Sequence, residues 1–118
     1  MEQLKVVDWA QGGWFLLESP GGNVYLDTRT AYGAFDGTAL LELEPHEIRR
    51  WRSEGNSVIH DLARQVYDHY YDPASDAGGH SVWWERDLRR SSHSRELRAA
   101  VMAAVREFRP WIEWKAKQ

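Results

Sequence analysis

The chain has 118 residues, 42% of them apolar and 28% charged, and a formal net charge of −3, which is typical of one soluble globular domain. It contains no cysteine, which excludes disulfides, thiolate metal sites and a cysteine nucleophile. No positively charged start precedes an apolar run, and no apolar stretch approaches the roughly 20 residues that span a bilayer. We therefore expect a soluble, cytoplasmic bacterial protein without a signal peptide.

The charge is divided unequally along the chain. Residues 1–76 contain 13 acidic and 6 basic residues, a net charge of −7, whereas residues 77–118 contain 5 acidic and 9 basic residues, a net charge of +4. An acidic first part disfavours nucleic acid as a partner and favours a basic protein. The basic last part leaves the opposite interpretation open.

The first third of the chain predicts an antiparallel sheet of three to four strands in meander order. Between the second and third strands, the turn residues Ser19–Asn23 lie between two apolar runs and predict a hairpin. The expected strands are Leu4–Trp9, Trp14–Glu18, Val24–Thr28 and Thr38–Glu44.

Helices are expected in the remainder. Pro45 fits the first position of a helix that Gly55 ends, and Asn56 or Ser57 would cap the next one. Apolar residues at helical spacing predict helices over 58–71 and 95–109. Their expected inner faces are Val58, Ile59, Leu62, Val66 and Tyr70 in the first helix, and Leu97, Val101, Ala104, Val105, Phe108 and Ile112 in the second.

Two further segments complete the prediction. Val82–Arg86 is expected as a short strand, and Pro110 is expected to kink or end the last helix, with Trp111 and Trp114 beyond that break. The fold class is then α+β: a single domain over residues 1–118 in which two to three helices pack on one face of an N-terminal meander.

The segment from Tyr67 to Asp72 combines aromatic and acidic side chains at the end of a predicted helix. A helical wheel places Tyr67 and Tyr71 on the solvent side, beside a stripe of carboxylates. Exposed aromatic rings next to charge are typical anchors of protein interfaces. The alternative is a solvated helix face whose tyrosines pack on the following loop. We name the candidate partner-binding residues the acid–aromatic face: Asp61, Tyr67, Asp68, Tyr71, Asp72 and Asp76.

A second candidate surface lies in the basic last third. Its arginines suggest a phosphate-binding surface on which two tryptophans stack with bases. The competing interpretation is a solvated flank that pairs with acidic residues, which the sequence pI of 5.9 favours. We name this alternative partner or nucleic-acid surface the arginine–tryptophan face: Trp83, Trp84, Arg86, Arg95, Arg98, Arg106 and Arg109.

The five histidines show no metal-ligand spacing, so no metal and no cofactor is expected. His60 beside Asp61, and His69 near Asp72, are the candidate His–carboxylate pairs of an enzyme. No nucleophile or second acid accompanies them in the sequence. The sequence therefore favours binding over catalysis.

Three segments resemble small bacterial immunity proteins of toxin–immunity systems, notably those of contact-dependent growth inhibition. They are Trp14–Leu17 before the Pro-Gly-Gly turn, Asn23–Asp27, and Gly55 ahead of the helix Val58–Tyr67, so the resemblance covers about residues 1–70. It implies a cognate toxin domain as the partner, commonly a basic nuclease, which is neutralised when the immunity protein occludes its active site. Neither the oligomeric state nor the face that docks follows from the resemblance.

Overall fold

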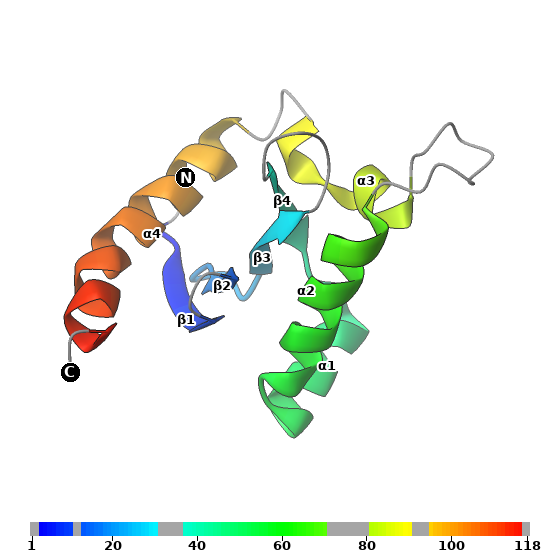
Figure 1. Cartoon of the computed structure of the whole chain (residues 1–118), viewed down its shortest axis with the longest axis horizontal. Helices are drawn as coiled ribbons and strands as arrows, with labels where there is room; N and C mark the ends of the chain where they lie inside the picture. The colour runs from blue at the N-terminus through cyan, green and yellow to red at the C-terminus, as the bar shows by residue number, and fades with distance from the viewer. Residues whose placement is uncertain (1–2, 11–12, 31–36, 71–80, 91–94, 117–118) are drawn as a thin grey trace.

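The computed structural model describes residues 3–10, 13–30, 37–70, 81–90 and 95–116 (Figure 1). Within them, the first half of the chain forms a four-stranded antiparallel sheet with the strand order β1-β2-β3-β4. The predicted meander is thus confirmed. The strands are β1 (Lys5–Ala10), β2 (Trp14–Glu18), β3 (Val24–Thr30) and β4 (Gly37–Glu42).

The predicted hairpin joins β2 to β3. The backbone N–H of Ser19 donates to the carbonyl of Asn23 at 2.9 Å, and the N–H of Gly22 donates to the carbonyl of Ser19 at 3.0 Å. Gly22 has a φ of 90°, a conformation that glycine adopts without the steric cost of a side chain. The turn sets the register in which Glu18 pairs with Val24.

Helices follow the sheet. Pro45 is the first residue of α1, and Gly55 closes that helix with a φ of 85° and an N–H that donates to Trp51, as the sequence predicts. Asn56 precedes α2, but its side chain makes no capping hydrogen bond. The helical elements are α1 (Pro45–Glu54), α2 (Ser57–His69), α3 (Val82–Arg86), the 3-10 turn η1 (Leu88–Arg90) and α4 (Arg95–Ala116).

Two local predictions need correction. Val82–Arg86 is a helix and not a strand, because the Ser81 hydroxyl accepts a hydrogen bond from the N–H of Trp84 and caps a first turn. Of the two outcomes expected at Pro110, a kink or an end, the end is wrong, because the last helix continues to Ala116 and includes Trp111 and Trp114. A proline removes one backbone hydrogen bond, and a long helix can lose one bond and continue.

The helices cover both faces of the sheet, whereas the sequence analysis expected them on one (Figure 1). Leu16 and Leu26 pack against Ile59 of α2, and Leu17 and Tyr25, on the opposite face, pack with the buried residues of α4. The physical reason is in β2 and the start of β3, where Trp14–Leu17 and Val24–Leu26 are continuous apolar runs and a one-sided sheet would alternate. Each face of the sheet is therefore covered by its own helices, and the described members of the acid–aromatic face, Asp61, Tyr67 and Asp68, lie on α2.

Candidate functional site

The α2 helix positions the described part of the acid–aromatic face. Ile59 and Val66 are buried against the sheet and Val58 is buried as well, so these residues fix which side of the helix faces inward. Tyr67 follows Val66 by about 100° around the helix and is 45% exposed. Tyr70 is buried. The predicted inner and outer positions of these residues are confirmed.

Two carboxylates share the outer side of α2 with Tyr67. Asp61 is exposed, and the side chain of Asp68 is 50% exposed. Asp68 lies 4.0 Å from Arg64, one helical turn earlier, in an exposed ion pair of the kind that contributes little to stability. The remaining predicted members of the face lie outside the described residues: Tyr71, Asp72 and Asp76.

A hollow of about 270 Å³ borders Tyr67, between α2 and the adjoining ends of β2 and β3. Inside this region, the indole N–H of Trp14 donates to Nδ1 of His60 at 3.3 Å, and the two rings meet edge to face. The enzyme interpretation had paired His60 with Asp61, but the structure pairs it with Trp14. Forty-six residues separate the two partners, so sequence spacing gave no signal of this contact.

The arginine–tryptophan face is not one surface in the structure. Trp83 and Trp84 are only partly exposed, because they pack against a buried cluster that includes Leu41, Val66 and Tyr70. The Trp84 ring centroid lies 5.5 Å from that of Tyr70. These rings complete the core on the α2 side, so they serve packing and do not form a platform for stacking with bases.

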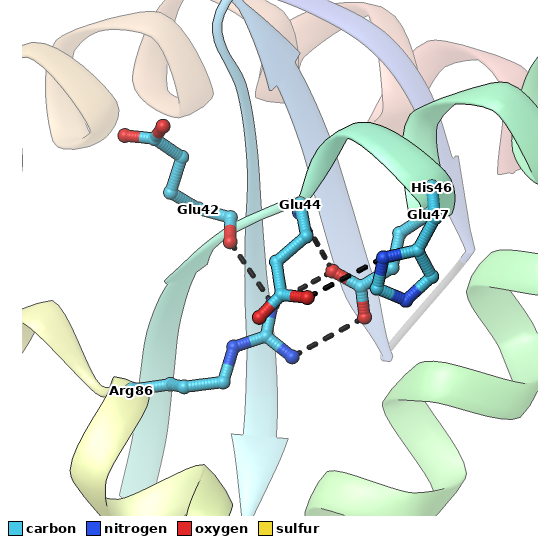
Figure 2. Close-up of polar contacts among 5 residues, drawn as sticks. All are labelled: Glu42, Glu44, His46, Glu47 and Arg86. Atoms are coloured by element: carbon cyan, nitrogen blue, oxygen red, sulfur yellow. Dashed lines mark hydrogen bonds and ion pairs between the residues drawn. The ribbon is translucent and has the colours of Figure 1, made fainter.

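Arg86 is held by the protein itself, as Figure 2 shows. Its guanidinium donates to both carboxylate oxygens of Glu47, at 3.2 and 2.7 Å, and to the carbonyl of Glu42 at 3.0 Å. The same Glu47 accepts the backbone N–H of Glu44 at 2.7 Å and so caps α1. Arg86 therefore connects α3 to the start of α1 and to β4. Because its guanidinium already binds these groups, it is poorly placed to bind a phosphate.

The arginines of α4 remain as a looser group. Arg95 and Arg106 are exposed, and Arg98 is partly buried. The side chain of Arg109 lies outside the described residues. The charge of Arg86 is neutralised by Glu47. Among the described side chains of the arginine–tryptophan face, Arg95 and Arg106 are the exposed ones.

The surroundings of Glu47 change its acidity. Burial alone would raise its pKa, but hydrogen bonds from Arg86 and from the Glu44 amide, with the charges of Arg86 and His46, lower the pKa below its ordinary value of 4.5. A carboxyl whose pKa is lower in the folded state stabilises the fold fully above pH 4.5. That contribution is lost as the pH falls through the folded-state pKa.

We expect Glu47→Gln to lower the free energy of unfolding by about 2 kcal/mol at pH 7, because charge-assisted hydrogen bonds are lost. The difference from the unsubstituted protein should shrink as the pH falls below 4.5. Urea denaturation between pH 7 and pH 3 measures both effects. Glu54→Gln, which breaks only the exposed pair with Arg50, serves as the control and should change stability little. If the difference in unfolding free energy between Glu47→Gln and the unsubstituted protein stayed constant with pH, the lowered pKa of Glu47 would be contradicted.

Sequence reasoning missed Asp87, the other buried acid near α3. Its Oδ1 accepts the backbone N–H groups of Leu40 and Arg89, both at 3.0 Å, and its Oδ2 accepts the hydroxyl of Tyr70. Asp87 thus connects α2, β4 and η1. Nearby, Arg89 forms a partly buried ion pair with Asp27 of β3 at 2.8 Å.

Comparison of the chain with protein-family models, with curated proteins and with solved structures found no match. In the described part of the chain, no three His, Asp or Glu side chains are grouped so that they could hold a metal ion. None of the helices described is both long enough and apolar enough to cross a membrane.

Proposed function

We propose that this protein binds a cognate toxin domain, most simply a basic nuclease, and neutralises it by stoichiometric occlusion. The observation that carries the proposal is Tyr67, a large amphipathic ring held 45% exposed on α2 beside the exposed carboxylates of Asp61 and Asp68. A ring fixed by its helix loses little conformational entropy on binding, and the flanking carboxylates attract a basic surface. The net charge of −7 over residues 1–76 extends that attraction over a longer range.

The packing of the arginine–tryptophan face supports a protein partner over nucleic acid. Trp83 and Trp84 contact the core, and Arg86 is neutralised by Glu47. A stacking site for bases needs accessible rings beside unpaired cations. The exposed arginines of α4 keep the nucleic-acid alternative testable. The two tryptophans and Arg86, which a base-stacking site would need, already contact other residues of the protein.

The proposal is tested by co-expression in bacteria. The toxin is taken as the protein encoded next to this one, and its domain is induced with and without this chain. We expect growth to be arrested by the toxin alone and restored by the chain in proportion to its expression, as stoichiometric inhibition requires. Arrest that persists at an excess of soluble chain would reject the function.

We also expect weak binding to nucleic acid. At about 150 mM salt, the Kd for duplex DNA or RNA should be no tighter than roughly 10⁻⁴–10⁻⁶ M, the range of non-specific binding. Fluorescence anisotropy with a labelled duplex and with single-stranded RNA measures it. Submicromolar binding that weakens steeply with salt and is abolished by replacing Arg95 and Arg106 would favour the alternative function.

A further inference from the structure

The hollow beside Tyr67 has a chemistry different from that of the carboxylates on the same helix. Its described lining carries two arginines, a histidine and two hydroxyl-bearing side chains, and no carboxylate. The lining residues are Gly13, Trp14, Thr28, Arg29, His60, Ala63, Arg64 and Tyr67. A concave site lined by N–H and O–H donors from two strands and a helix is suited to an anion.

The contact between Trp14 and His60 fixes which imidazole nitrogen is a donor. Nδ1 accepts the indole N–H at 3.3 Å, so Nδ1 carries no proton and the proton of the neutral ring is on Nε2. His60 lies on the exposed side of α2 while Trp14 is buried beneath it. In the tautomer that accepts the buried indole N–H, the other nitrogen carries the proton and can donate a hydrogen bond to a ligand.

Arg64 supplies a positive charge to the hollow that the protein compensates only weakly. Its side chain is 83% exposed, and its distance of 4.0 Å from Asp68 is at the limit for an ion pair. Such a contact between exposed groups exchanges readily with solvent or with another anion. The guanidinium can therefore turn to an oxyanion in the hollow at small cost.

We propose that this hollow receives a carboxylate side chain of the protein partner, held by Arg64 and His60 with Tyr67 at its border. A carboxylate fits better than the phosphates of a nucleic acid, because Asp61 and Asp68 lie next in sequence to the lining residues His60 and Tyr67 and would repel a polyanionic backbone. A single acidic side chain meets less repulsion, and the bases around it on the partner offset what remains. The inference rests on the proposed function for the identity of the partner. It also fixes how the partner is oriented: an acidic side chain lies at the hollow, and basic side chains lie against Asp61 and Asp68.

The site itself is tested without a partner. Acetate is titrated into the protein at constant ionic strength, and the imidazole resonances of His60 are followed by NMR. We expect saturable shifts with a Kd on the order of millimolar. Arg64→Gln should weaken acetate binding at least fivefold. Arg49→Gln, the same change at an exposed arginine of α1, should leave it unchanged.

Saturable binding of inorganic phosphate with no response to acetate would overturn the choice of a carboxylate, and absence of response to both would overturn the site. The toxin domain is then titrated into the same variants, with melting temperatures measured to verify folding. A tenfold loss of toxin affinity in Arg64→Gln, but not in Arg49→Gln, would support the inference. Unchanged toxin affinity in Arg64→Gln would overturn the inference and leave the proposed function intact. Acetate binding without any toxin complex would instead reject the proposed function, and with it the partner's carboxylate as the occupant.

Discussion

Asp87→Ala is expected to lower the free energy of unfolding by about 3 kcal/mol, the largest stability effect of any single change considered. The substitution removes the acceptor of three donors: the N–H of Leu40, the N–H of Arg89 and the hydroxyl of Tyr70. Leu40 and Tyr70 are buried, so the substitution takes away an acceptor from donors that lie inside the protein. Urea denaturation at pH 7 measures the effect.

Two conservative variants separate the hydrogen bonds of Asp87 from its volume. Tyr70→Phe removes one donor and keeps the packed ring, so it should cost only about 1 kcal/mol. Asp87→Asn keeps an amide oxygen that can still accept hydrogen bonds from the backbone. Its loss of unfolding free energy should lie between those of Tyr70→Phe and Asp87→Ala. An Asp87→Ala variant as stable as Tyr70→Phe would show that the backbone contacts of Asp87 contribute little.

Tyr67→Ala should weaken binding to the toxin domain by about 2 kcal/mol, roughly 30-fold in Kd, if Tyr67 is the anchor of the interface. The same change should leave the melting temperature nearly unaltered, because the ring is 45% exposed and points away from the Val66 side of α2. Surface plasmon resonance and thermal denaturation on the same samples measure both quantities.

Two control variants separate the contribution of the Tyr67 ring to binding from that of the nearby charge. Tyr67→Phe retains the ring and should lose much less affinity than Tyr67→Ala. Asp68→Asn should mainly slow association, and its effect should shrink at high salt, because exposed charges act by long-range steering. A Tyr67→Ala variant that loses stability while keeping its affinity would identify the tyrosine as a packing residue.

Local patterns predicted most of the fold, because each depends on residues close in sequence. The Ser19–Asn23 turn, Pro45 at the start of α1 and Gly55 at its end lie where the sequence places them. The inner face of α2 follows from helical periodicity. The helix at Val82–Arg86 was missed because five residues carry too little periodicity to separate strand from helix, and the Ser81 cap decides between them.

Long-range pairing accounts for what the sequence did not predict. Arg86 was grouped with the other arginines of the last third, yet its partner Glu47 lies 39 residues away. Asp87 and Leu40, and Trp14 and His60, are similarly distant. The two buried faces of the sheet could have been predicted, since the uninterrupted apolar residues of β2 and of the first three positions of β3 already indicate them. For the candidate site, the sequence identified the exposed side of α2 but not the hollow beside it.

Isothermal titration calorimetry of the chain with the neighbouring toxin domain tests the central claim most directly. The account predicts a one-to-one complex with a Kd on the order of 10⁻⁸ M or tighter at physiological salt, as expected for a specific interface of standard size. The absence of binding heat at several temperatures, together with elution of the two proteins as separate species in gel filtration, would contradict it.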